Sequence, residues 1–373
     1  MKKIKNIIWK LITGISIFGL IVLLLSAFAD CFSPLSFPYI PFFGLFFPFI
    51  LAFNVLFFIF WIISWIFFKK WKQMLFTLFV FIICWGSIRT YFPINSKTKE
   101  IPENSIKILT YNVMRFEYFG KHTQEKTNPI IQYIVDEDPD IVCIQEYGIA
   151  LDNKKQLMGK DITTALKKLP YHEVVKLSPH SKSHLFGLAV FSKYPILSVK
   201  KMPFESEYNG SAVFELDING RRVTLINNHL ESNKISADER SGYFDLTQAP
   251  STQKIEAFTH LMFQRLTPAF KIRAEQATEI REVIKATENP YIIVCGDFND
   301  TPISYARQKI GKDLKDAFVE SGSGMGVTFN RHRFLFRIDY ILHSKNMKAH
   351  NCTVGKLMNS DHYPVWTYLE FLD

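Results

Sequence analysis

Three long apolar runs occupy most of the first 92 residues, and they constrain the fold more than any other feature of the 373-residue sequence. The runs are 11–29, 42–68 and 74–92, and their only charge, Arg89, lies near the end of the last. A helix needs about 20 apolar residues to cross a bilayer. A cleaved signal peptide would explain the first run but not the two that follow it. We therefore expect a membrane anchor of three transmembrane helices within residues 1–95.

Basic residues are distributed unevenly around these runs. Eight basic residues and one acid give the first 92 residues a net charge of +7, whereas 36 basic and 34 acidic residues give the remainder +2. Lysines precede the first run and separate the second from the third, and none lies between the first and the second. Lysine-rich flanks stay in the cytoplasm. We therefore expect a multi-pass protein of the cell (inner) membrane whose remaining domain is periplasmic or otherwise extracytoplasmic.

After the last apolar run the pattern changes to short apolar segments bounded by Gly, Pro, Asn and Asp. Strand-length segments of this kind are 106–113, 140–145, 187–192, 212–218, 222–228, 291–295 and 337–342. Helical spacing occurs at 129–135, 161–169 and 272–285. Strands and helices mixed over about 280 residues predict one layered α/β domain.

The domain boundaries follow from composition. We place a polar linker at 96–105 and the domain at 106–373. Within the domain, residues 231–270 are interpreted as a long, irregular insertion of undefined role. The five cysteines form no CxxC pair, which argues against zinc. Three of them fall in the domain, and burial would reconcile free thiols with an exported location.

Polar side chains end or follow six of the apolar stretches. They are Asn112, Glu146, His229, the pair Asp297 and Asn299, Asp339, and the pair Asp361 and His362. Each alone is explained more simply by a turn or a strand end. A carboxylate or imidazole beside an apolar strand must be paired or lie at the strand mouth, because burying it alone is costly. Six such endings on one chain predict convergence on one site.

Together, these segments resemble the endonuclease/exonuclease/phosphatase superfamily, the DNase I-like fold that includes exonuclease III, DNase I, inositol polyphosphate 5-phosphatases and neutral sphingomyelinases. The resemblance covers about Ile106 to Phe371. Its strongest parts are Gln145-Glu146, Gly296-Asp297-Phe298-Asn299, and Ser360-Asp361-His362 preceded by Arg337-Ile338-Asp339-Tyr340. Arg273 and Gln276 resemble the pair on the helix that precedes the Gly-Asp-Phe-Asn strand. The resemblance implies a four-layered α/β/β/α sandwich.

The resemblance also implies a divalent-metal site. Glu146 would be the principal ligand of Mg²⁺ or Mn²⁺, with Asn112 close by and Asp361 completing the metal side. Hard oxygen ligands suit these ions. Many nuclease members have an acid two residues after the Asn of the first motif, and this chain has Met114. One metal held mainly by Glu146 is therefore the safer interpretation.

Catalytic roles are implied for five further residues. Asp297 would orient or deprotonate the attacking water, Asn299 would fix a phosphate or nucleophile oxygen, and His229 would donate to the phosphate. Asp339 would hold the ring of His362, which would stabilise charge on the phosphoryl group or act as acid or base. Whether Asp297 or His362 is the general base stays open at this stage.

Substrate contacts are less well defined. Arg331, Arg333 and Arg337 precede or enter the Asp339 strand and are either phosphate ligands or a solvated charge run. The implied function is a membrane-anchored, metal-dependent phosphodiester hydrolase. Its substrate would be DNA or RNA, as for a nuclease, or a phospholipid, as for a sphingomyelinase-like enzyme at the bilayer. An alternative from another class is a non-catalytic membrane binding protein that retains the fold.

Overall fold

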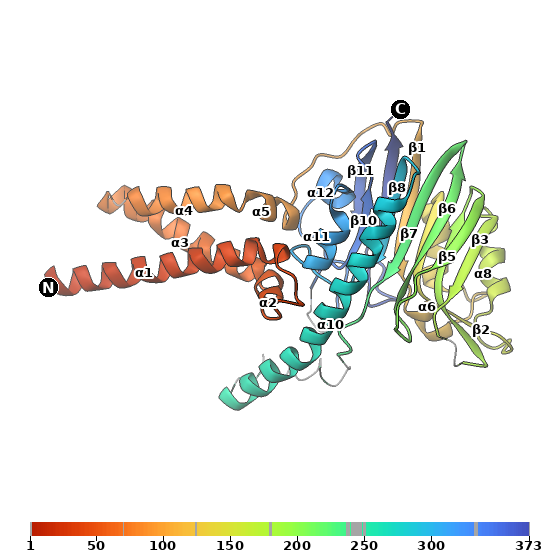
Figure 1. The fold of residues 1–373 in the computed structure, drawn as a ribbon, viewed down its shortest axis with the longest axis horizontal. Coiled ribbons are helices and arrows are strands. Elements are labelled where there is room, and N and C mark those ends of the chain that lie inside the picture. Colours follow the sequence, from red (N-terminus) through yellow and green to blue (C-terminus); the bar gives the residue numbers. More distant parts are fainter. Residues whose placement is uncertain are drawn as a thin grey trace.

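The structure is a computed structural model that describes most of the chain. The described residues are 2–69, 71–123, 125–178, 181–235, 239, 248, 251–331 and 335–372. Figure 1 shows long helices of the amino-terminal segment projecting from one side of a domain that contains two β-sheets. The apolar runs and the strongly basic part of the chain both end at residue 92, just before the domain.

The projecting helices form the amino-terminal bundle. Its elements are α1 (Lys2–Ala27), η1 (Ala29–Cys31), α2 (Ile40–Leu45), α3 (Phe47–Phe68), α4 (Trp71–Ile83) and α5 (Trp85–Tyr91). Helices α1 and α3 are long and apolar enough to cross a membrane. The third apolar run, expected as one continuous span, is broken at Cys84, where α4 and α5 meet at 65°. The described helices therefore supply two spans, or three if the bent pair counts as one.

Buried polar contacts join α1 to α3. The Nδ2 atom of Asn54 donates to the carbonyl oxygen of Gly19 at 3.0 Å, and Nε1 of Trp61 donates to Oγ of Ser16 at 2.9 Å. Between apolar helices in a membrane, such contacts and close packing replace the hydrophobic effect as the source of association. These contacts fix how the two long helices pack against each other.

The inner end of the bundle packs directly against the domain. Ile303, in the loop after strand β8 (Tyr291–Asp297), belongs to the same buried apolar cluster as residues of α1 and α3. The ring of Phe42 in α2 packs against Phe263 in a tilted contact and against Phe270 edge to face, with centroids 4.4 and 5.4 Å away. Figure 1 shows α2 close to the long helix α10 (Thr252–Ala286), which carries both of these rings. The bundle and the domain therefore share a core.

The first sheet has six strands in the order β11-β12-β1-β2-β4-β3. Their bounds are β1 (Ser105–Asn112), β2 (Ile141–Ala150), β3 (Tyr171–Lys176), β4 (His184–Ser192), β11 (Met347–Val354) and β12 (Val365–Phe371). Strands β1 and β2 are parallel, so their carboxyl ends meet at one edge. Helices α7 (Pro129–Glu137) and α8 (Gly159–Ala165) contribute Ile130, Ile134 and Ile162 to the apolar layer on its outer face.

The second sheet has the order β5-β6-β7-β8-β10-β9. Its further strands are β5 (Ile196–Lys201), β6 (Gly210–Ile218), β7 (Arg221–His229), β9 (Lys315–Asp316) and β10 (Asp339–His343). Here β7 and β8 are the parallel pair. Helices α10 and α11 (Tyr305–Gly311) pack on its outer face. The short helix α12 (Ala317–Ser321) follows β9, and α6 (Met114–Phe119) is a left-handed turn with φ angles of 44–69°.

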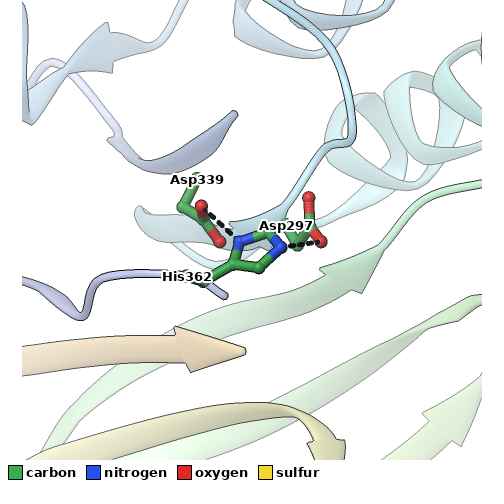
Figure 2. Close-up of side chains that lie close together, drawn as sticks. All are labelled: Asp297, Asp339 and His362. Atoms are coloured by element: carbon green, nitrogen blue, oxygen red, sulfur yellow. Dashed lines mark hydrogen bonds and ion pairs between the residues drawn. The ribbon is translucent and has the colours of Figure 1, made fainter. Parts of the chain in front are cut away.

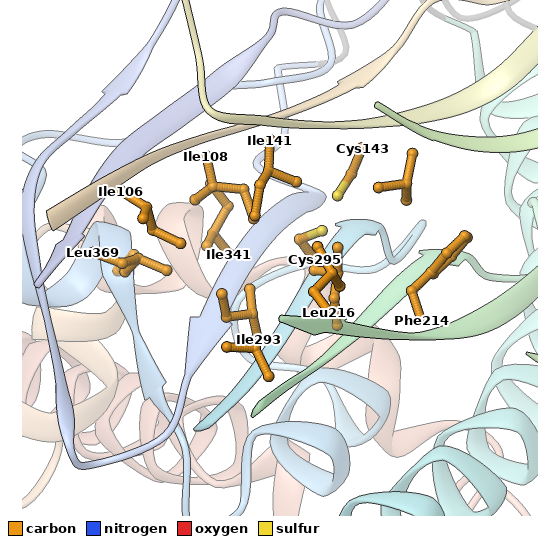
Figure 3. Close-up of a cluster of buried hydrophobic side chains, with 14 of the residues drawn as sticks. Ile106, Ile108, Ile141, Cys143, Phe214, Leu216, Ile293, Cys295, Ile341 and Leu369 are labelled. Atoms are coloured by element: carbon orange, nitrogen blue, oxygen red, sulfur yellow. The ribbon is translucent and has the colours of Figure 1, made fainter. Parts of the chain in front are cut away.

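The main core lies between the two sheets. Figure 3 shows Ile108, Ile141 and Cys143 of the first sheet facing Ile293 and Cys295 of the second. All five side chains are fully buried. The layers are therefore helix, sheet, sheet and helix, which confirms the expected α/β/β/α architecture. The three cysteines of the domain are free and buried.

Two expectations from the sequence need correction. Strands β3, β5, β9, β11 and β12 were not predicted, since edge strands such as β3 and β5 are largely exposed and lack an apolar run. Residues 252–270 are helical rather than irregular. Pro268 obscures this helix, because proline normally ends one. The helix starts where the Ser251 side chain accepts from the main-chain nitrogen of Lys254.

Candidate active site

The topology gathers the predicted residues at one edge of the sandwich. Asn112 ends β1, His229 ends β7 and Asp297 ends β8, so two parallel pairs bring their carboxyl ends together. Asp339 begins β10, which runs antiparallel to β8 and pairs directly with Asp297. Ladders of main-chain hydrogen bonds therefore set the positions of these side chains.

A histidine between two carboxylates forms the centre of this edge (Figure 2). Nδ1 of His362 lies 2.9 Å from Oδ2 of Asp339, and Nε2 lies 3.6 Å from Oδ2 of Asp297. All three side chains are buried. Burial alone would lower the pKa of His362, but the charges of Asp339 and Asp297 outweigh it and raise this pKa to about 10. At neutral pH the ring is therefore a doubly protonated donor.

For Asp297, burial outweighs the neighbouring charge. Burial raises the pKa of its carboxyl to about 6, against the opposing positive charge of His362. The main-chain nitrogen of Asn299 donates to its Oδ1 at 2.8 Å, and Nδ2 of Asn299 lies 3.3 Å from its Oδ2. Asn299 has a φ of 52°, a left-handed conformation that asparagine tolerates better than most residues. The Asp297 carboxylate is therefore both held in place and close to its proton-binding range.

Glu146 reaches the site because β2 bulges. The register with β4 shifts between Ile144 and Tyr147, and Glu146 has a φ of 49°. Nδ2 of Asn112 donates to Oε1 of Glu146 at 3.3 Å and to Oδ2 of Asp297 at 3.1 Å. Asn112 thus links the carboxylates from the two sheets. Its own oxygen accepts from the main-chain nitrogen of Met114 at 3.2 Å, which fixes the orientation of the amide.

The donors around Glu146 fit a hard divalent cation. Burial among protein atoms and the negative charge of Asp361 both raise the pKa of Glu146. A cation relieves this repulsion, and a third of the Glu146 side chain remains open to water and substrate oxygens. The cluster of Asp297, Asp339 and His362 also lies within metal-binding distances. An ion there would have to displace the proton of His362, and Glu146 and Asp361 stay the predicted metal ligands.

His229 completes the edge from the second sheet. Its Nε2 lies 3.6 Å from Oδ2 of Asp297 and 4.0 Å from Oε1 of Glu146. Burial lowers its pKa, so the ring is neutral. Nδ2 of Asn209 lies 3.2 Å from the same nitrogen and also donates to the carbonyl of Leu230. Asn209 was not predicted, because it lies in a loop before β6 and no apolar pattern marks it.

Helix α10 holds the two loops that carry these residues. Nε of Arg273 donates to Oδ2 of Asp300, and Nη1 donates to the carbonyl oxygen of Glu231, at 3.1 and 2.8 Å. Gln276 accepts from the main-chain nitrogen of Glu231 at 2.9 Å. Arg273 is fully buried. The pair predicted on this helix therefore supports the loops after His229 and after Asn299.

The three predicted substrate arginines have different surroundings. Nη2 of Arg331 lies 3.6 Å from Sδ of Met114, next to the first motif. Arg333 lies outside the described residues. Arg337 is buried, with its guanidinium 4.6 Å above the ring of Phe318 and hydrogen-bonded to the carbonyl of Thr90. The structure thus places Arg337 at the contact with the amino-terminal bundle, which corrects its assignment to substrate binding.

Family comparison agrees with this geometry. Residues 109–362 match the model of the Endonuclease/Exonuclease/phosphatase family. Since this match spans more than half of the chain, the chain belongs to that family and is a hydrolase of phosphoester bonds. Residues 9–91 match a second model, described as Domain of unknown function (DUF8431). A search of curated proteins found no match.

Solved structures with a similar fold are distant in sequence. An endonuclease/exonuclease/phosphatase family protein from Leptotrichia buccalis has 18% identity and a TM-score of 0.49, covering 71% of this chain and 100% of that one. ANGEL2, described as a 2',3'-cyclic phosphatase, has 17% identity and a TM-score of 0.48, with coverages of 75% and 100%. A humanized D. rerio TDP2 has 14% identity and a TM-score of 0.46, with coverages of 72% and 99%.

Proposed function

We propose that this protein is a divalent-metal-dependent phosphodiester hydrolase of the cell membrane whose catalytic domain lies outside the cytoplasm. The observation that carries the proposal is the line from Asp339 through His362 to Asp297, with Glu146 linked to Asp297 through Asn112. A non-catalytic binding module would have no use for a protonated histidine held between two buried carboxylates. Family membership supports the hydrolytic chemistry.

In the proposed reaction, Asp297 is the general base. A base must be unprotonated at the working pH, and a pKa of about 6 leaves Asp297 a carboxylate near neutrality. His362 keeps its proton under the same conditions, because its pKa is about 10. Asp297 therefore accepts the proton of the attacking water. His362 donates a hydrogen bond to the phosphoryl group and stabilises its negative charge.

The remaining residues position the substrate and the ion. Glu146 and Asp361 would hold Mg²⁺ or Mn²⁺, which would neutralise charge on the phosphoryl oxygens. His229, when its Nε2 carries a proton, donates to a phosphoryl oxygen, and Asn299 holds the Asp297 carboxylate in place. Arg331, beside Met114, is a candidate phosphate ligand.

Location in the membrane is supported by the two long apolar helices α1 and α3. The lysine pattern supports a cytoplasmic amino terminus, and three spans would place the domain on the other side. We propose residues 1–95 as the anchor, 96–105 as the linker and 106–373 as the catalytic domain. Because Ile303 packs into the anchor, the full chain is the appropriate material for assays.

The experiment is a comparison of ester classes with the full chain in detergent micelles. With Mg²⁺, we expect turnover of an activated phosphodiester to exceed that of the matching phosphomonoester, and EDTA to abolish both activities. Adding back Mg²⁺ or Mn²⁺ should restore turnover. Full activity in EDTA would reject the metal dependence, and a preference for the monoester would reject the assignment as a diesterase.

A further inference from the structure

Arg115 lies in the turn that follows the first motif, near the proposed metal site. Beyond the Glu146 bulge, Gly148 of β2 pairs with Phe186 of β4. A Cβ atom at Gly148 would lie 2.7 Å from Cγ of Arg115, so the glycine leaves space for this side chain. The guanidinium of Arg115 is centred 5.9 Å from the ring of Phe186 and 5.0 Å from that of Tyr118. The cation is therefore held against aromatic faces.

Further aromatic rings extend this surface toward the other sheet. The ring of Phe186 lies 6.3 Å from Tyr208 and 5.8 Å from Phe119, in edge-to-face contacts. Tyr208 comes from the loop before β6 in the other sheet. It directly precedes Asn209, which contacts His229. The aromatic wall, defined as Arg115, Tyr118, Phe119, Phe186 and Tyr208, thus reaches the site residues of both sheets.

Two tyrosine rings of the aromatic wall are largely exposed to solvent. Tyr118 is 60% exposed and Tyr208 is 55% exposed, although both border a site made of buried groups. On the same strand as Phe186, Leu188 and Val190 are buried in the core between the sheets. Phe186 therefore continues the apolar face of β4 beyond the core and into the open edge. Rings in this position offer contact area to a substrate without being needed to close the sandwich.

The chemistry of the wall discriminates between substrate classes. Aromatic rings and a guanidinium plane both stack on nucleobases, and each stacked base contributes appreciably to binding without sequence preference. A quaternary ammonium headgroup also favours aromatic faces but is repelled by the charge of Arg115. An acyl chain gains nothing from a guanidinium. With a net charge of only +2 after residue 92, the domain is also poorly suited to bind a long phosphate backbone.

We propose that the aromatic wall binds the base of a nucleotide whose phosphoester is cleaved at the site of Glu146 and Asp297. This inference rests on the proposed function and adds the substrate class, which is a nucleotide ester or a short single strand. Stacking supplies the affinity, and only one or two phosphates are contacted. Water attacks the phosphorus atom and gives a proton to Asp297, and the bond to the leaving oxygen breaks with its electron pair on that oxygen, which departs as an alkoxide or phenoxide and takes a proton from solvent.

A matched pair of substrates tests this inference. The full chain in detergent micelles with Mg²⁺ is given thymidine 5′-p-nitrophenyl phosphate or methyl p-nitrophenyl phosphate, which share a leaving group and differ in the nucleoside. We expect kcat/KM to favour the nucleoside ester by about tenfold or more, mainly through KM, as expected for one stacked base. A ratio near one, or faster hydrolysis of sphingomyelin in vesicles, would overturn the proposal.

Variants locate the effect. Tyr208→Ala should reduce the substrate ratio severalfold by raising KM for the nucleoside ester, and Tyr208→Phe, which keeps the ring, should restore it. Tyr171→Ala is the matched control, because Tyr171 is also an exposed tyrosine but pairs with Ser192 at the opposite end of β4. An unchanged ratio in Tyr208→Ala would contradict the wall as the binding surface.

A binding measurement separates this proposal from the proposed function. Fluorescently labelled oligothymidylate of about four nucleotides is titrated onto the full chain carrying Asp297→Asn. Binding that weakens about tenfold with an added Tyr208→Ala supports the wall even if neither ester is hydrolysed. Hydrolysis of the methyl ester without measurable binding of the oligonucleotide would leave the proposed function standing and reject the wall.

Discussion

Gly44 of the amino-terminal bundle packs against the main chain of Ile303 in the catalytic domain. A methyl group added at Gly44 would overlap the carbonyl oxygen of Ile303, so only glycine allows this approach. Ile303 lies four residues after Asn299, in the loop that also contains Asp300. The bundle therefore contacts the loop that follows Asp297 at the end of β8.

This contact predicts that Gly44→Ala reduces activity. Overpacking of a tight contact typically costs 1–3 kcal/mol and displaces neighbouring main chain. We expect kcat of the full chain to fall severalfold, with a lower Tm, because the loop after Asn299 must move. Gly86→Ala is the control, since a methyl group there meets no atom within 4 Å. Equal kcat values for the two variants would show that the bundle does not position this loop.

The pKa values predict a bell-shaped pH dependence. Activity should rise as Asp297 ionises near pH 6 and fall as His362 loses its proton near pH 10. Asp339 contributes the largest of the charges that raise the pKa of His362. Asp339→Asn should therefore move the alkaline limb of kcat/KM to lower pH. A profile with an unmoved alkaline limb in this variant would exclude His362 as the group that titrates there.

Removing the Glu146 charge should separate metal binding from folding. Glu146→Gln removes a carboxylate whose pKa is raised by burial and by Asp361, so the metal-free Tm should not decrease. Wild-type Tm should increase with added Mg²⁺, because an ion that binds only the folded state stabilises it. The variant should lose this increase and at least about 100-fold in turnover. An equal Mg²⁺-dependent Tm increase in the variant would place the metal elsewhere.

The candidate site residues that lie at strand ends could be recognised from the sequence. Glu146, Asp297 and Asp339 follow or begin apolar runs. Strand pairing sets Asp339 opposite Asp297, whereas Glu146 belongs to the other sheet and is linked to Asp297 through Asn112. Arg115 and Asn209 were missed because they lie in loops, where position depends on tertiary contacts. Arg337 was assigned incorrectly because its partner, the carbonyl of Thr90, belongs to the amino-terminal bundle, and the sequence does not reveal that contact.

Topology is tested by protease accessibility. If lysine-flanked ends stay inside and the bent pair α4 and α5 completes a third span, the domain is outside the cytoplasm. Protease added to intact spheroplasts should then degrade the part of the chain after Phe92. A cytoplasmic marker protein should remain intact in the same sample. Protection of the domain until lysis would require two spans or the reverse orientation.

The central claim is that Asp297 activates water in a metal-dependent phosphodiester hydrolysis. The most direct test is the turnover of an activated phosphodiester by the full chain carrying Asp297→Asn, compared with wild type at saturating Mg²⁺. We predict that kcat falls at least about 100-fold, while the Mg²⁺-dependent increase in Tm is kept because Glu146 and Asp361 are unchanged. Turnover within about threefold of wild type would contradict the account.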